Sequence, residues 1–95
     1  MPRVSKKETI EIGRKLKVNF ESISVETLQN GIKVELEHGK NKKTNVIGMN
    51  LMKAAKIALA HLSEFPNYYE ELEKMEEKLK SQWKGKRKPR IFLNE

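Results

Sequence analysis

The stretch that decides the fold class is SVETLQNGIKVELEHG, residues 24–39. Leu28, Ile32 and Leu36 recur in it every four residues, which is the spacing of one face of an α-helix. Ser24 is a good N-cap residue, because its side chain can accept a hydrogen bond from a free N–H of the first turn. The pattern therefore predicts a helix over nearly all of this stretch.

The same stretch also fits a strand. Ile32, Val34 and Leu36 alternate with polar residues, as side chains do in a half-buried strand. Gly31 adds weight to this alternative, because glycine costs a helix about 1 kcal/mol relative to alanine. A strand over residues 32–38 would make the fold α+β, and we favour the helix.

Three further helices are indicated by cap residues and apolar spacing. Ser5 followed by Glu8 has the spacing of a capping box. Asn50 can cap an alanine-rich helix, and Pro66 is suited to the first turn of another. The sequence thus predicts an all-α fold, a compact bundle of about four helices at 6–17, 24–38, 51–63 and 66–82.

The apolar faces of these helices predict the core. The expected core residues are Ile12, Leu16, Leu28, Ile32, Leu36, Leu59, Leu62, Tyr68, Leu72 and Met75. Tyr69 lies about 100° around the helix from Tyr68 and is expected at the rim of the core. Phe65 is expected to fill the corner between the last two helices.

Length and composition limit the class of protein. A chain of 95 residues is large enough for one domain with a modest core. It has no cysteine, which excludes disulfides and thiolate metal sites and is typical of a reducing compartment. It contains no run of about 18 apolar residues and no secretory signal. We expect a soluble protein with no membrane segment, located inside the cell (cytoplasm or nucleus) or in a virion, and not secreted.

Positive charge is concentrated at the C-terminus. Residues 78–95 carry seven Lys and Arg side chains and one glutamate, so they supply +6 of the formal net charge of +7. Gly85 and Pro89 disfavour helix, and the charge density opposes collapse. The sequence therefore predicts a helical domain over 1–82 and a flexible basic tail over 83–95.

This tail is the strongest functional signal in the chain. Closely spaced Lys and Arg side chains neutralise phosphates and release counterions, which gives sequence-independent attraction to nucleic acid. The predicted nucleic-acid-binding residues are Lys84, Lys86, Arg87, Lys88 and Arg90, with Lys40, Lys42 and Lys43 of the loop before residue 51 as an extension of the basic surface. A protein assembly partner, a nuclear-import signal and a solvated tail without a partner remain alternatives.

One set of side chains could carry chemistry. Glu35 with His38, and His61 with Glu64, each share a helix face at a spacing of three residues. Two such pairs resemble part of the ligand set of carboxylate-bridged metal bundles, although further carboxylates would be needed. We expect a structural role instead, with the two histidines close together and no metal or other cofactor bound.

The order of several segments resembles a known family. The segments are GIKVELEHG at 31–39, TNV at 44–46, AKIALAHLSEFPNYY at 55–69, Leu72, and Met75 with Glu76. They resemble an uncharacterised family of small domains of unknown function found in large DNA viruses, phages and bacteria. The resemblance covers about residues 8–79 and implies a compact, mostly helical domain with no assigned activity. The family pattern has an aspartate where this chain has Asn67.

These observations predict a non-enzymatic accessory protein. Its basic tail would attach it to nucleic acid, or to a nucleoprotein or virion assembly. The alternative is a small metal-dependent or acid–base enzyme that uses Glu35, His38, His61 and Glu64. The sequence leaves the oligomeric state open.

Overall fold

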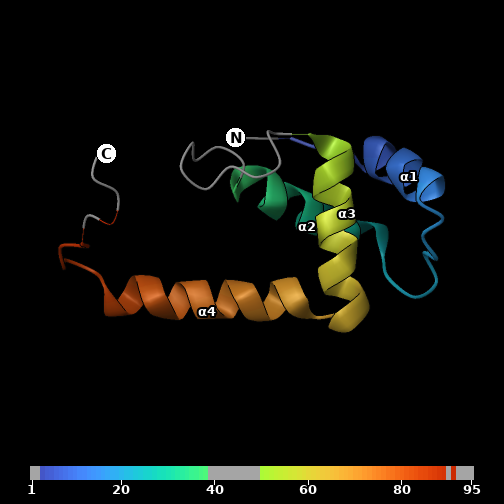
Figure 1. Ribbon diagram of the computed structural model, residues 1–95. Coiled ribbons are helices and arrows are strands. Elements are labelled where there is room, and N and C mark those ends of the chain that lie inside the picture. Colours follow the sequence, from blue (N-terminus) through green and yellow to red (C-terminus); the bar gives the residue numbers. More distant parts are fainter. Residues whose placement is uncertain (1–2, 39–49, 90, 92–95) are drawn as a thin grey trace.

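The computed structural model describes residues 3–38, 50–89 and 91. Its regular elements are four helices, α1 (Lys6–Lys15), α2 (Val25–His38), α3 (Leu51–Glu64) and α4 (Tyr68–Gln82). The described residues form no strand, and Figure 1 shows three helices packed together with α4 running away from the end of α3. The predicted all-α fold is confirmed. The alternative of a strand over 32–38 is wrong, because these residues continue α2.

Side-chain caps fix the starts of the first three helices. Ser5 Oγ accepts a hydrogen bond from the Glu8 N–H, and a Glu8 carboxylate oxygen accepts one from the Ser5 N–H, both at 3.0 Å. This is the predicted capping box. Ser24 Oγ accepts a backbone N–H at the start of α2 (3.0 Å), and Asn50 Oδ1 accepts one at the start of α3 (2.9 Å).

Helix α1 ends two residues earlier than predicted, at a Schellman motif. Lys17 has a left-handed φ of 60°, and its N–H bonds to the Arg14 carbonyl at 3.2 Å. The Val18 N–H bonds to the Gly13 carbonyl at 2.8 Å, which completes the motif. The turn returns the chain so that the Phe20 ring lies where a side chain on Gly13 would be.

The core lies mainly between α2 and α3, and α1 packs against α2. Its buried apolar side chains are Val4, Ile12, Leu28, Ile32, Leu36, Ala54, Ala55, Ala58, Leu62 and Tyr69. Leu16, Leu59, Tyr68 and Leu72, which were also predicted as core, are partly buried against this cluster. Alanines make the buried face of α3 narrow, so α2 can approach it closely.

Gly31 is at the point of closest approach. A Cβ atom on Gly31 would lie 2.8 Å from Cε2 of the Tyr69 ring and 3.1 Å from Cβ of Ala58. The glycine that suggested a strand is therefore a packing residue of α2, and close contact with two other helices compensates for its poor helix propensity.

Helix α4 is packed only at its beginning. It begins at Tyr68, two residues after the predicted start at Pro66, and Asn67 makes no side-chain cap. Tyr69 is buried (3% exposed), whereas Met75 is 51% exposed and Phe65 is 59% exposed. The predictions of Met75 as core, Phe65 as a corner plug and Tyr69 as a rim residue are therefore wrong. The predicted apolar stripe exists on α4, but the other three helices cover only its first part.

Beyond Leu72 the stripe faces outward. Leu79 is 44% exposed and Trp83, the residue that ends α4, is 40% exposed. No described helix is long and apolar enough to span a lipid bilayer. The fold therefore consists of a packed unit of α1, α2, α3 and the start of α4, from which the rest of α4 projects.

Candidate functional site

The basic end of α4 consists of Lys78, Lys80, Lys84, Lys86, Arg87 and Lys88. All six side chains are exposed. The first two lie on the last turns of α4, and the other four follow Trp83. Gly85 has a positive φ of 73°, and the Lys86 N–H bonds to the Trp83 carbonyl at 3.0 Å, so the chain turns directly after the helix. The turn keeps the later cations close to those on the helix.

The chain after this turn comes back beside α4. Leu79, Trp83, Pro89 and Ile91 line a shallow apolar groove, and Glu76, Lys80 and Lys88 also line it. Ile91 is 77% exposed even so. The end of α4 thus combines an exposed indole and aliphatic side chains with cations on the same surface.

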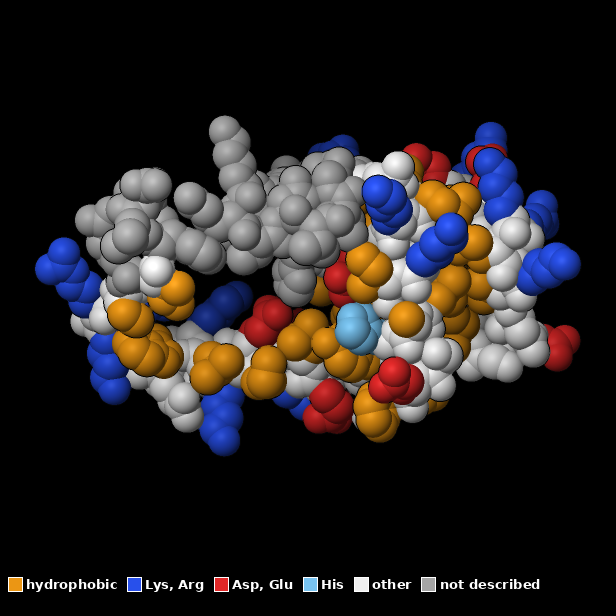
Figure 2. Space-filling model, viewed as in Figure 1, with side chains coloured by type: hydrophobic (Ala, Val, Ile, Leu, Met, Phe, Trp, Pro, Cys, Tyr) orange, Lys and Arg blue, Asp and Glu red, His pale blue; other side chains and the backbone are white. Residues whose placement is uncertain are grey.

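These cations have no acidic partner among the described residues. The ion pairs found there are Lys6 with Glu26 (3.0 Å), Lys74 with Glu71 (3.4 Å) and His61 with Glu35 (4.0 Å). Figure 2 shows orange hydrophobic side chains in a row along α4 and blue Lys and Arg side chains toward its C-terminal end. The predicted contributors Arg90, Lys40, Lys42 and Lys43 lie outside the described residues.

A second cluster joins α2, α3 and α4 around a buried carboxylate. Glu35 is 7% exposed, and the Tyr69 hydroxyl donates a 2.8 Å hydrogen bond to its Oε2. His61 Nε2 lies 4.0 Å from the same oxygen, and the His61 ring stacks on Tyr68 with centroids 4.2 Å apart. Tyr69 meets both of these rings edge to face. The cluster thus fixes the start of α4 against α2 and α3.

Burial determines the protonation of Tyr69. Removal from water raises the pKa of its hydroxyl far above the ordinary value, and the hydrogen bond to the Glu35 carboxylate raises the pKa further. The tyrosine hydroxyl therefore stays protonated at every physiological pH and donates its hydrogen bond to Glu35. This arrangement satisfies a buried acid and does not resemble an activated base.

The structure brings together only part of the predicted Glu and His set. Glu35 and His61 meet, whereas Glu64 is exposed on the surface of α3. The His38 side chain lies outside the described part of the structure, so the predicted proximity of the two histidines stays a prediction. No group of three or more potential metal ligands occurs among the described side chains.

The residue that sequence reasoning missed is Tyr69. The signal that could have indicated it is the pair Gly31 and Ala58. These two small residues on the facing helices leave space for the Tyr69 ring. The spacing of apolar residues along α4 favoured Tyr68 instead, because spacing alone does not show where a helix leaves the core.

Comparison with protein families matches residues 9–78 to the family described as proteins of unknown function (DUF5661). The chain belongs to this family. The Glu35 cluster lies inside the DUF5661 match, whereas most of the basic end of α4 lies after it. Comparison with the curated proteins and with the solved structures finds no significant match.

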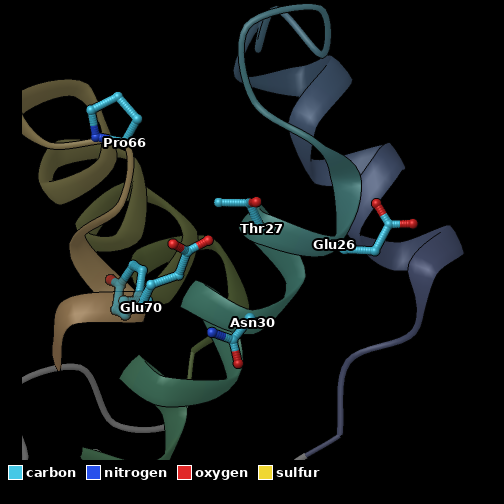
Figure 3. Close-up of a pocket in the computed structure, with 6 residues that line it drawn as sticks. Glu26, Thr27, Asn30, Pro66 and Glu70 are labelled. Carbon is cyan, nitrogen blue, oxygen red and sulfur yellow. The ribbon is translucent and has the colours of Figure 1, made fainter. Parts of the chain in front are cut away.

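Another pocket of this DUF5661 domain lies between α2 and the corner that joins α3 to α4. Figure 3 shows Thr27 pointing toward Pro66 and Glu70, while the Glu26 carboxylate points away from them. The hydrogen bond from Lys6 lowers the pKa of Glu26 below its ordinary value and keeps that carboxylate directed to α1. The polar side chains therefore do not converge on a common point, and the basic end of α4 is the better candidate site.

Proposed function

We propose that this DUF5661 protein is a non-enzymatic accessory protein that binds nucleic acid through the basic end of α4. One observation carries the proposal. Residues 78–88 contain six basic side chains and no acid, and all six are exposed at the end of a helix that projects from the packed unit. A projecting end can contact the phosphates of a nucleic acid without a steric clash with the other helices.

Phosphate contact is the chemistry these side chains supply. Each phosphate neutralised by Lys or Arg releases condensed counterions, so affinity falls as salt rises. Trp83 lies beside Lys80 and Lys88 and offers an aromatic face on which an unpaired base could stack. The chain after the helix offers no regular element to hold side chains against base edges, so we expect little sequence preference.

The proposed setting depends on where members of the family are expected to occur. If DUF5661 proteins occur in large DNA viruses and phages as we expect, the partner is a genome or a nucleoprotein assembly, inside a cell or a virion. A protein partner with an acidic surface is the competing possibility, and the test includes it.

The test compares two variants of equal charge in the full chain. The first replaces the predicted tail cations Lys84, Lys86, Arg87, Lys88 and Arg90 by glutamine. The second replaces five exposed cations elsewhere, Lys7, Arg14, Lys15, Lys33 and Lys53, by glutamine. Each loses five of the seven units of net charge, so only the position of the charges differs. A third variant replaces Lys40, Lys42 and Lys43 by glutamine and tests whether these lysines extend the basic surface.

Binding to duplex DNA, single-stranded DNA, RNA and an acidic polypeptide is measured by fluorescence anisotropy across salt. For about four or five neutralised phosphates, log K against log salt should have a slope of about −3 to −5 on duplex. The first variant should lose this binding and its salt dependence, and the second should keep most of both. Equal binding by the wild type and the first variant would refute the proposal, and binding of the acidic polypeptide alone would favour a protein partner.

The enzyme alternative has less support. Of its three described side chains, Glu35 and His61 meet and Glu64 lies apart from them on the surface. The Glu35 oxygen nearest His61 already accepts the Tyr69 hydrogen bond. We therefore assign the Glu35 cluster to the stability of the fold.

A further inference from the structure

The chain that follows α4 forms an apolar groove with the end of the helix. The Trp83 N–H bonds to the Leu79 carbonyl at 3.0 Å, and Gly85, with its left-handed φ of 73°, then turns the chain. Leu79 and Trp83 line the groove from the helix, and Pro89 and Ile91 line it from the returning chain. Trp83 is 40% exposed there. The basic end of α4 therefore has a shaped apolar surface as well as its cations.

Cations border this groove. Lys80 and Lys88 line it together with the hydrophobic side chains. Lys80 precedes Trp83 by three residues, which places the two side chains next to each other on the helix surface. Neither lysine has an acidic partner among the described residues. The groove therefore offers an aromatic and aliphatic surface with positive charge beside it.

The position of Glu76 makes the two ends of the groove different. This glutamate also lines the groove, but it lies about 10 Å before Trp83 along α4. The six basic side chains of residues 78–88 all follow it. A phosphate would therefore be attracted to the Trp83 end of the groove and repelled from the Glu76 end.

We infer that this groove binds an unpaired base of a single-stranded nucleic acid, with the base against Trp83 and the adjoining phosphates on Lys80 and Lys88. The inference rests on the proposed function and names the class of nucleic acid that the site takes. A nucleotide has an apolar base face close to a phosphate, which matches the chemistry of the groove. The bases of a duplex are stacked on one another, so their faces are not accessible to an indole.

The charge of the groove distinguishes this ligand from a purely apolar one. An apolar protein surface placed on the groove would remove Lys80 and Lys88 from water without a partner, which is unfavourable. A nucleic-acid strand brings a phosphate to each lysine. The earlier part of the apolar stripe, around Phe65 and Met75, lies on a segment rich in glutamate, which repels phosphate. The inference therefore concerns the end of α4 alone.

The fluorescence of Trp83 tests the contact directly, because this residue is the single tryptophan of the chain. The full chain is titrated with a thymidine strand of about ten nucleotides, and with an abasic strand and a duplex of the same length. The abasic strand has the same phosphates and no bases. We expect the thymidine strand to quench the fluorescence and to bind at least about fivefold more tightly than the abasic strand. The abasic strand and the duplex should leave the fluorescence nearly unchanged.

Three variants, measured by the anisotropy of labelled strands, locate the effect. Trp83→Leu keeps an apolar side chain without the indole, and it should lower affinity for the thymidine strand to that for the abasic strand. Trp83→Phe keeps an aromatic ring and should retain part of the preference. Phe65→Leu removes an aromatic ring that is exposed outside the groove, and it should bind like the wild type. All three keep the charge, so the salt slope should not change. Circular dichroism checks that they are folded.

The three nucleic acids separate failure of this inference from failure of the proposed function. Salt-dependent binding of all three, with no preference for the thymidine strand over the abasic strand, would overturn the inference and leave the proposed function intact. The same holds if Trp83→Leu weakens binding to both strands equally, since the indole would then act without a base. Binding to none of the three would refute both.

Discussion

The neighbouring residues Tyr68 and Tyr69 show which face of α4 packs into the core. Tyr69 has a hydroxyl that reaches Glu35, and its ring fits the space left by Gly31 and Ala58. Tyr68 has the better helical spacing with Leu72, yet it stacks on His61 and stays partly exposed. Spacing could predict that one tyrosine packs inward. The choice between them depends on a long-range hydrogen bond that no local pattern contains.

Tyr69→Phe should destabilise the fold by about 1–3 kcal/mol near neutral pH, because it leaves the buried Glu35 carboxylate without its donor. Tyr68→Phe is the matched control and should change stability by less than about 0.5 kcal/mol. Urea unfolding measures both. In the combined variant Glu35→Leu with Tyr69→Phe the unsatisfied group is gone, so stability should recover relative to Tyr69→Phe alone.

The same pair gives a pH dependence with a definite sign. The pKa of Tyr69 is raised in the folded state, so its contribution to stability is complete below the unfolded pKa of about 10 and is lost as pH rises above it. At about pH 11, one unit above the unfolded pKa, the wild type should have lost about 1.4 kcal/mol from this group. The stability difference between wild type and Tyr69→Phe should narrow by that amount. A constant difference from pH 8 to pH 11 would show that the pKa is not raised.

At the scale of elements, the sequence predicted the helices well because their caps are local. Ser5 with Glu8, Ser24 and Asn50 each bond to the backbone within three residues, so the sequence contains all that is needed. The end of α1 was missed because the Schellman motif there uses Lys17 in place of the usual glycine. The amphipathic pattern of α4 was also correct as a pattern. It could not show that α4 leaves the packed unit after its first turns, so that the rest of the stripe is exposed.

The division of α4 into a packed start and a projecting end can be measured with two equal truncations. Leu72→Ala should cost about 2 kcal/mol, because this side chain packs against the core cluster. Leu79→Ala removes the same atoms from an exposed position and should cost less than about 0.5 kcal/mol. Urea unfolding makes the comparison. Equal costs for the two variants would mean that α4 is packed along its full length.

At the scale of the whole molecule, the part of the chain that is packed and the part that carries the charge are different segments. Apart from its residues before residue 9, the packed unit lies within the DUF5661 match. It is close to neutral, whereas the projecting end carries most of the net charge. The sequence predicted this separation because charge is additive and needs no knowledge of the fold. Only the structure shows that these cations lie at the end of a helix that projects from the packed unit.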